Sequence, residues 1–292
     1  MKVQWYPGHM NKARKMMEND MKLVDLVIEI IDARAPLSSR NPDIDKMAGS
    51  KARLIIMNKC DLADKNISEE WKNYFEKKGF QVAFVNSKNK EGLRLVMPAV
   101  KKACEAKIRR NAEKGIKNQP IRAMVAGIPN VGKSTFINAI SGKNMAKTGN
   151  KPGVTKGEQW IKLNNELQLL DTPGILWPKF EDQNVGKKLA FLGSINDEIL
   201  VTEELAGELL LFLKEKYPKL LEARYNLSDE TCPLDTEDEN GFSTPQSLMM
   251  DYIAKQRGCL KAGAETDYFK TAGVILEDFR SGKIGSITLE EP

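Results

Sequence analysis

The sequence lacks the features of a secreted, disulfide-linked or membrane-spanning protein. Its four cysteines are scattered, and no pair has zinc-site spacing or supports a disulfide; they are Cys60, Cys104, Cys232 and Cys259. The longest apolar runs fall far short of the roughly 20 residues that a membrane helix needs. No basic stretch followed by an apolar run opens the chain, so we expect no signal peptide. These absences favour a reduced, cytoplasmic protein with no membrane partner.

Charge is plentiful but unevenly divided along the chain. Residues 1–177 carry 32 Lys and Arg against 18 Asp and Glu, a net charge of +14, whereas residues 178–292 carry 13 against 22, a net charge of −9. The first part is therefore suited to a polyanionic partner. Its densest basic stretch is either a solvated helix face or a surface that neutralises RNA phosphates. That stretch consists of Lys101, Lys102, Lys107, Arg109, Arg110, Lys114, Lys117 and Arg122.

Apolar runs and their spacing predict an α/β domain at the start of the chain. Nearly continuous apolar runs, typical of parallel strands covered on both faces, lie at 25–31, 53–57, 82–85 and 122–126. A hairpin is expected to join 159–163 to 167–170. Helical patterns lie among these strands, at 10–22, 68–78, 91–114 and 133–141. This alternation is typical of a doubly wound α/β sheet.

Strand signals end near residue 178. Helices are predicted at 184–191, 203–216, 247–255 and 266–280, and the polar, acidic stretch 228–241 is predicted to be a loop. The chain shows no internal repeat. Its 292 residues are enough for two modest domains, which we place at 1–178 (α/β) and 179–292 (all helical).

The strongest motif is a glycine-containing loop that follows the apolar strand 122–126 and opens a helix. It reads Gly127-Ile128-Pro129-Asn130-Val131-Gly132-Lys133-Ser134-Thr135. In this context backbone N–H groups face phosphates, and the helix N-terminus adds positive potential. Lys133 is expected to place its ammonium on the β- and γ-phosphates, and Ser134 to offer its hydroxyl to Mg²⁺. The loop predicts a nucleotide site, to which Asn130, Val131 and Thr135 also belong.

Two further runs supply groups for a Mg²⁺-bound triphosphate. Asp171-Thr172-Pro173-Gly174 ends a predicted strand, so Asp171 can hold Mg²⁺ through water and the Gly174 N–H can reach the γ-phosphate. Thr155, in Pro152-Gly153-Val154-Thr155, is the candidate threonine that caps Mg²⁺ when a triphosphate is bound. In catalysis Lys133 and a Mg²⁺ held by Ser134 and Thr155 would share the charge of the transition state.

The base is predicted to be guanine. Asn58-Lys59-Cys60-Asp61 follows the strand 53–57, and the Asp61 carboxylate can accept two hydrogen bonds, from guanine N1–H and from the exocyclic amine. Adenine has no such pair of donors, and an unpaired buried carboxylate is costly. The stem of Lys59 can pack over the base. Asn86-Ser87-Lys88, one strand later, fits a loop whose backbone contacts guanine O6. Together these runs select GTP and GDP over ATP.

The motifs run in an unusual order, and one expected residue is missing. The base-reading run precedes the phosphate loop, whereas it follows that loop in Ras-like GTPases. A circular permutation keeps every contact and moves only the termini. Ile175 follows Gly174, where Ras-like proteins carry a water-orienting glutamine, so intrinsic hydrolysis is expected to be slow unless another group positions the water. The only histidine, His9, is either that group or a structural or exposed residue.

The chain resembles the ribosome biogenesis GTPase A family, the permuted bacterial GTPases of the YlqF/RbgA type, over nearly its whole length. The matching runs are Trp5-Tyr6-Pro7-Gly8-His9-Met10, Asp32-Ala33-Arg34-Ala35-Pro36, Asn58-Lys59-Cys60-Asp61, the phosphate loop, Pro152-Gly153-Val154-Thr155, Arg257-Gly258-Cys259-Leu260 and Gly282-Lys283-Ile284-Gly285. Related permuted families carry an N-terminal OB domain or a zinc finger, for which this chain has neither the room nor the cysteine spacing. The implied fold is a circularly permuted Ras-like P-loop GTPase domain followed by a small all-α domain.

The resemblance implies a GTPase that acts late in assembly of the large ribosomal subunit. It would bind precursor particles in its GTP state and leave on hydrolysis, which the ribosome stimulates. His9 is implicated in hydrolysis, and potassium would act through Asn130. The helical domain would contact ribosomal RNA, but its net negative charge restricts that contact to a local surface around Lys255, Arg257, Lys261 and Lys283. Ser286 stands where we expect a basic residue.

Two other functions fit the same motifs. The first is a non-enzymatic switch that binds GTP and is read by effectors with negligible turnover. The second is a partner in RNA modification, such as a tRNA-modifying GTPase, which would bind tRNA instead of large-subunit particles. Nothing in the sequence suggests an obligate dimer, so we expect a monomer.

Overall fold

The computed structural model describes residues 8–116, 119–143, 159–178, 180–232 and 244–292. The chain divides into two compact units, of which the first takes in Gln4–Leu189 and Thr288–Pro292 and the second Ala190–Ile287. The predicted division at residue 178 stays a prediction. By compactness, the first unit continues to Leu189 and also includes the last residues of the chain.

A six-stranded sheet forms the centre of the first unit, in the order β3-β2-β1-β4-β6-β5. The strands are β1 (Leu26–Asp32), β2 (Ala52–Asn58), β3 (Gln81–Val85), β4 (Ile121–Ala126), β5 (Gln159–Lys162) and β6 (Leu167–Asp171). All neighbours pair in parallel except β5, which forms an antiparallel hairpin with β6. The predicted strands and the hairpin are confirmed. Every residue of β1 is buried, as its apolar run predicts for a central strand covered on both faces.

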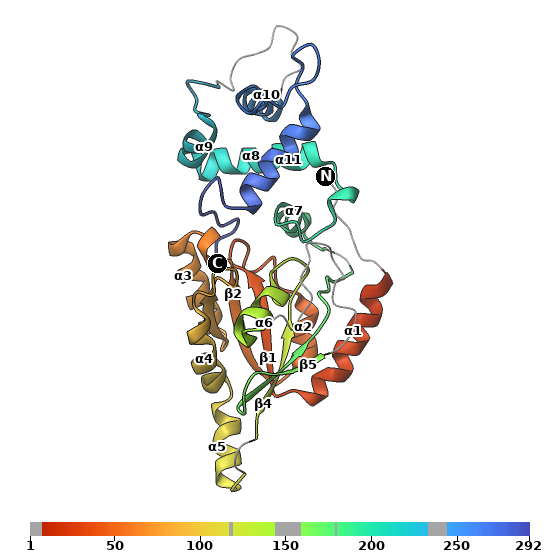
Figure 1. The fold of residues 1–292 in the computed structure, drawn as a ribbon, viewed down its shortest axis with the longest axis vertical. Helices are drawn as coiled ribbons and strands as arrows, with labels where there is room; N and C mark the ends of the chain where they lie inside the picture. The colour runs from red at the N-terminus through yellow and green to blue at the C-terminus, as the bar shows by residue number, and fades with distance from the viewer. Residues whose placement is uncertain (1–7, 117–118, 144–158, 179, 233–243) are drawn as a thin grey trace. The chain divides into compact units, whose positions relative to one another are not determined.

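Helices cover both faces of this sheet. Figure 1 shows α3 and α4 on one side and α1 and α2 on the other. The helices of this unit are α1 (Gly8–Asp20), α2 (Pro42–Ala48), α3 (Lys65–Lys77), α4 (Val96–Ala103), α5 (Glu105–Glu113) and α6 (Lys133–Ser141), with α7 (Gln183–Phe191) at the division between the units. The α/β fold with strand and helix in alternation is therefore confirmed.

The single helix predicted at 91–114 is wrong. A short 3₁₀ turn (Leu93–Leu95) precedes α4, and the helix is interrupted at Cys104 before α5 begins. Cys104 has φ −101° and ψ 13°, outside helical values, and its side chain is buried, whereas no residue of α5 is buried. Burial raises the pKa of the Cys104 thiol to about 11. The periodic pattern continues across Cys104 because both helices are amphipathic or polar, so it carries no signal for the interruption.

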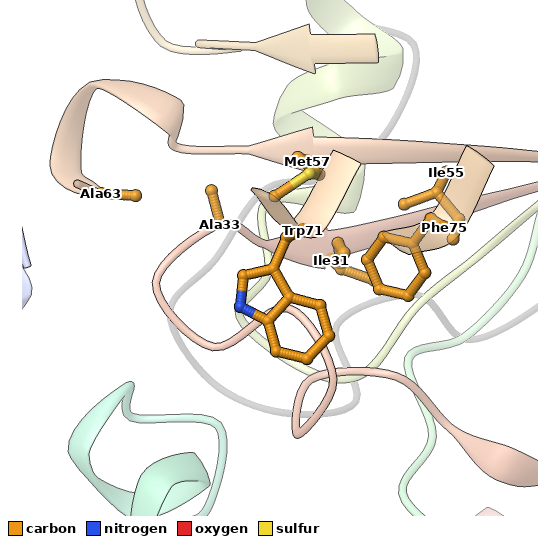
Figure 2. Close-up of a cluster of buried hydrophobic side chains, with 7 residues drawn as sticks. All are labelled: Ile31, Ala33, Ile55, Met57, Ala63, Trp71 and Phe75. Carbon is orange, nitrogen blue, oxygen red and sulfur yellow. The ribbon is translucent and has the colours of Figure 1, made fainter. Parts of the chain in front are cut away.

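Aromatic residues of α3 form the core beside β1 and β2. The rings of Trp71 and Phe75 stack with their centroids 5.6 Å apart. Figure 2 shows these two rings with the aliphatic side chains of the two strands; the cluster consists of Ile31, Ala33, Ile55, Met57, Ala63, Trp71 and Phe75. Such burial stabilises by about 25 cal/mol per Å² of apolar surface, so this cluster anchors the loops that leave the ends of β1 and β2.

A buried ion cluster lies beside the same core. Glu29, in the middle of β1, accepts hydrogen bonds from Arg40 Nη2 at 2.8 Å and from Arg53 Nη2 at 3.0 Å. Asp45 accepts from both guanidinium groups, at 2.7 and 2.8 Å. Both guanidinium groups also lie over the ring of Phe80, at 4.8 and 5.1 Å from its centroid. The cluster is neutral, and each charge within it has an opposite charge in contact.

The second unit is helical in its described part. The predicted helices are found as α8 (Thr202–Lys216), α10 (Pro245–Arg257) and α11 (Tyr268–Arg280), and α9 (Pro218–Tyr225) was not predicted. α8, α10 and α11 pack on one another, and each buries apolar side chains, such as Leu209, Ile253 and Ile275. The predicted acidic loop 228–241 is irregular up to residue 232, and the rest of it lies outside the described residues. In the described parts of the chain, no helix has the length and apolar character of a membrane span.

Candidate functional site

The base-reading run lies directly on the phosphate loop. Asn58 Nδ2 donates to the Val131 carbonyl at 2.7 Å, and Lys59 Nζ donates to the Asn130 carbonyl at 2.8 Å. Two segments about 70 residues apart in the sequence, in reversed order relative to Ras-like GTPases, thus meet at one edge of the sheet. β2 and β4 both point their carboxyl ends to this edge, where ligands of open α/β sheets bind.

Glycines of the phosphate loop let the chain approach its neighbours closely. Gly132 has φ +89°, and a Cβ there would lie 2.4 Å from Asn58 Nδ2. A Cβ at Gly127 would lie 2.6 Å from the carbonyl oxygen of Ile30. A side chain at either position would displace the loop, since real Cβ atoms do not approach this closely. These positions therefore keep the backbone free to face a phosphate.

Lys133 and Asp171 form a buried ion pair beside this loop. Lys133 begins α6 and is 6% exposed, and its Nζ lies 2.5 Å from Asp171 Oδ1 at the end of β6. Burial lowers the pKa of the Lys133 ammonium, and the Asp171 carboxylate offsets only part of that shift. Ser134 and Thr135 follow in the first turn of α6 and are half-buried. Lys133, Ser134 and Asp171, three of the residues predicted to bind the triphosphate and Mg²⁺, are thus close together.

The run after Asp171 packs against the phosphate loop. Thr172 is buried, and its hydroxyl donates to the Val125 carbonyl at 2.8 Å. A Cβ at Gly174 would lie 3.2 Å from Pro129 N, so the Gly174 backbone lies against the loop. Ile175 is buried, and its carbonyl accepts from Asn41 Nδ2 at 3.1 Å. Asn41 caps α2, an element that the sequence analysis missed.

The predicted guanine-side loop also reaches this site. Ser87 donates through its backbone N–H and its hydroxyl to Asn58 Oδ1, at 3.1 and 2.8 Å. Asn86 is buried and Lys88 is exposed. Asp61 lies in the exposed 3₁₀ turn Cys60–Leu62, immediately after Lys59, which has φ +57°. Asn58 therefore joins three predicted segments, because its side chain contacts the phosphate loop and Ser87.

Sequence reasoning missed one charged group that this geometry brings to the site. Asp32 ends β1 and is buried, and its carboxylate accepts from Lys59 Nζ at 2.8 Å. Arg34 donates to the same carboxylate through Nε at 3.0 Å and through Nη2 at 2.9 Å. The sequence does contain a signal for this group. Asp32 and Arg34 belong to the run 32–36, which was assigned only to the family resemblance. An acidic residue at the carboxyl end of a buried strand next to the phosphate-loop strand could have been assigned to the site.

Replacing Asp32 with asparagine is expected to destabilise the protein at pH 7 but much less at low pH. Burial by itself raises the pKa of the Asp32 carboxyl, but Arg34 and Lys59 outweigh burial and hold that pKa well below its usual range. This shift stabilises the folded protein at pH values above the pKa that Asp32 has in the unfolded chain. As pH falls below about 4, the stabilisation is lost by about 1.4 kcal/mol per pH unit. Urea unfolding of both proteins at pH 7, 4 and 3 measures this. A difference independent of pH would contradict it.

Two predicted catalytic residues are not placed in this site. Thr155 lies outside the described residues, so its predicted role stays a prediction. His9 lies in the first turn of α1, and its role also stays a prediction. Among the residues that the structure describes, no group of three or more His, Cys, Asp or Glu side chains could by itself hold a metal ion.

The predicted basic stretch is largely exposed. Lys102, Arg110 and Lys114 are exposed, whereas Lys101 pairs with Glu166 at 2.9 Å and Lys107 pairs with Asp25. In the helical unit, Arg257 donates to the Arg224 carbonyl at 2.7 Å, and Lys283 lies 3.5 Å from Asp278. Lys255 and Lys261 are exposed.

This chain is similar to known GTPases in both sequence and fold. A family model described as "50S ribosome-binding GTPase" matches residues 122–229. "Ribosome biogenesis GTPase A" of Bacillus licheniformis is 46% identical over 100% of this chain and 99% of its own length. Its counterpart in Bacillus cereus is 46% identical over 100% of this chain and 95% of its own. The solved GDP-bound structure of YlqF from Thermotoga maritima shares the fold, with a TM-score of 0.67 and 24% identity over 95% of this chain and 99% of that one.

Proposed function

Because this chain belongs to the ribosome biogenesis GTPase A family, we propose that it hydrolyses GTP late in the assembly of the large ribosomal subunit, with turnover that the ribosome stimulates. Membership of this family identifies the chain as a GTPase of ribosome biogenesis. One observation carries the proposal for this chain. The base-reading run and the phosphate loop are joined by hydrogen bonds of 2.7 and 2.8 Å, so one nucleotide can contact both.

Different residues of the site would bind the base and the phosphates of GTP. Asp61 would accept two hydrogen bonds from the guanine edge, and Lys59 would cover one face of the base with its stem. Backbone N–H groups of the phosphate loop would face the phosphates at the N-terminus of α6, where Gly132 is the capping residue. Lys133 would exchange its contact with Asp171 for the β- and γ-phosphates. The remaining contacts are assigned to Asn86, Ser87, Lys88, Asn130, Val131, Thr135 and Gly174.

The oxygen donors beside the phosphate loop fit Mg²⁺. This ion is usually held by one or two protein groups together with phosphates and water, and Ser134 and Asp171 have that chemistry. We assign them, with Thr155, to Mg²⁺, which would neutralise charge on the phosphates when bound. Asn130 is the candidate ligand for K⁺.

Hydrolysis needs a group that positions water, and Ile175 does not supply it. Its side chain is apolar and buried in the first unit. We propose that His9 orients or deprotonates the water when the chain is bound to the ribosome. Lys133 and Thr155 complete the proposed catalytic set, because they would share the negative charge that develops on the transferred phosphoryl group.

Replacing His9 with alanine is expected to preserve GTP affinity and to abolish stimulated turnover. General acid–base or water-orienting groups typically contribute about 10²- to 10⁴-fold to a rate. Phosphate release from GTP, measured with and without purified large ribosomal subunits, detects the change, and co-sedimentation with those subunits checks that binding is retained. An unchanged stimulated rate would exclude this role for His9.

The same measurements separate the competing functions. The proposal predicts slow phosphate release by the wild-type chain alone and an increase of at least about tenfold with large ribosomal subunits. A switch without enzymatic activity predicts no increase, and an RNA-modification partner predicts retention on tRNA instead. Co-sedimentation with subunits should be stronger with a non-hydrolysable GTP analogue than with GDP. We expect a monomer acting in the cytoplasm.

We propose α4 and α5 as one surface that contacts ribosomal RNA. The exposed cations Lys102 and Arg110 lie on these two helices, and the exposed Lys114 directly follows α5. No residue of α5 is buried. A helix that is polar all round gains little from packing on its own domain. Exposed cations of this kind bind phosphates by releasing counterions, which makes the interaction sensitive to salt. On the helical unit we assign RNA contact to Lys255 and Lys261, since Arg257 and Lys283 contact groups within that unit.

A further inference from the structure

The last residues of the chain bind the first unit beside the base-reading run. We propose that this segment, Thr288–Glu290 (the terminal strap), is a positioning element for guanine-nucleotide binding, because it holds the loop after β1 and, through Asp32 and Arg34, the base-covering Lys59. The inference rests on the proposed function, in which Lys59 contacts guanine. It adds a role for residues far from every nucleotide motif in the sequence.

Glu290 is the main anchor of the terminal strap. Its side chain is 7% exposed, and its carboxylate accepts hydrogen bonds from the backbone N–H groups of Leu37 and Ser38 and from the Ser38 hydroxyl. Lys188 Nζ lies 2.9 Å from the same carboxylate. Hydrogen bonds to an ionised acceptor are stronger than neutral ones, and here several converge on one group. A buried carboxylate with this many donors is a formed binding site for the terminal residues.

The rest of the terminal strap contacts both base-side loops. Leu289 N donates to the Arg34 carbonyl at 2.7 Å, and Asp64 N donates to the Thr288 hydroxyl at 3.0 Å. The Trp71 indole N–H donates to the Glu290 carbonyl at 3.0 Å, and Trp71 belongs to the core cluster in Figure 2. The terminal strap therefore joins the loop after β1, the loop after β2 and the aromatic core of α3.

A continuous series of contacts leads from the terminal strap to the nucleotide site. Leu289 holds the backbone of Arg34, whose guanidinium is fixed on Asp32 at 2.9 and 3.0 Å. Asp32 in turn holds Lys59 Nζ at 2.8 Å, and the same Nζ reaches the Asn130 carbonyl of the phosphate loop. Asp32 and Arg34 are buried, so their side chains have little freedom to move independently of the loop. Releasing the terminal strap would therefore loosen the support of Lys59.

The test uses the full chain and measures GDP dissociation with a fluorescent GDP analogue. Glu290→Ala is expected to increase the dissociation rate about tenfold, since it removes several hydrogen bonds to a charged acceptor. Ser38→Ala removes one donor and is expected to give about a threefold increase, which keeps the test possible if Glu290→Ala folds poorly. Glu76→Ala, a charge removal on the exposed face of α3, is the matched control and is expected to leave the rate unchanged.

Two further readouts separate positioning from a general loss of structure. Inorganic tripolyphosphate, which lacks the base, should compete for the site equally well in the wild type and in Glu290→Ala. In a double-mutant cycle, Glu290→Ala should add little to the defect of Lys59→Ala, because the strap acts through Lys59, which is already absent from that variant. The inference would be overturned if the two effects in the cycle were additive, or if Glu290→Ala weakened tripolyphosphate binding as much as GDP binding. It would also be overturned if Glu290→Ala and Ser38→Ala both left the GDP dissociation rate unchanged. Failure of the wild-type chain to bind GDP would instead overturn the proposed function.

Discussion

Replacing Asp61 with asparagine is expected to lower the affinity for GDP at least about 100-fold. The variant loses two hydrogen bonds from guanine to a charged acceptor, and each such bond contributes roughly 1.5–3 kcal/mol. A loss of about 3 kcal/mol corresponds to somewhat more than a factor of 100 in the dissociation constant. Asp61 lies in an exposed turn, so the substitution should leave the melting temperature of the nucleotide-free protein unchanged. Titration with a fluorescent GDP analogue measures the affinity.

Xanthosine diphosphate provides the control for Asp61. Xanthine has a carbonyl oxygen in place of the guanine amine, and an asparagine amide can donate to that oxygen where a carboxylate cannot. Binding of xanthosine diphosphate should therefore improve in the variant while binding of GDP falls. If the variant binds GDP within threefold of the wild type, Asp61 does not read the base, and the assignment of the run Asn58–Asp61 is wrong.

Replacing Glu29 with glutamine is expected to destabilise the protein by about 3–5 kcal/mol. The Glu29 side chain is 1% exposed, and those of Arg40 and Arg53 are 10% and 12% exposed. Breaking a buried ion pair on one side leaves an uncompensated buried charge, and that cost exceeds the value of the pair itself. The only opposite charge left in this cluster, as far as the described residues show, is Asp45, which is 46% exposed. The free energy of unfolding in urea measures the effect.

Two further variants identify why Glu29→Gln destabilises the protein. Asp45→Asn removes the exposed acidic partner and should cost no more than about 1 kcal/mol, as is usual for exposed pairs. The triple variant Glu29→Leu, Arg40→Met and Arg53→Met removes every buried charge of the cluster and should be more stable than Glu29→Gln alone. A triple variant that is less stable than Glu29→Gln would mean that packing, and not the unpaired charge, sets the cost.

Much of the candidate site could be predicted because its motifs are local. The run Gly127–Thr135 indicates a loop and a helix N-terminus within nine consecutive positions, directly after an apolar strand. In the structure β4 ends at Ala126, the loop follows, and α6 begins at Lys133. Backbone N–H groups at a helix start bind phosphate wherever the helix lies in the fold. The reversed order of the runs did not affect the prediction, since parallel strands bring their carboxyl ends to one edge of the sheet whatever their order in the chain.

Other elements gave too weak a local signal. α2 and α9 are short, with seven and eight residues, and each begins at a proline, which also marks loops. The break at Cys104 occurs inside a stretch whose helical periodicity continues on both sides. Periodicity reports which face of an element is apolar; it does not report whether two successive turns share one axis.

The sequence by itself therefore determined the class of fold, the strands and the guanine-nucleotide motifs, because each of these depends on neighbouring residues or a short period. Only the tertiary structure decided which distant groups meet. Asp32 lies beside Lys59, Arg40 and Arg53 converge on Glu29, and Glu290 binds Ser38 across 252 positions of sequence. Such pairs follow no period and no spacing rule, since they are set by where the packed sheet and its helices bring the ends of their loops.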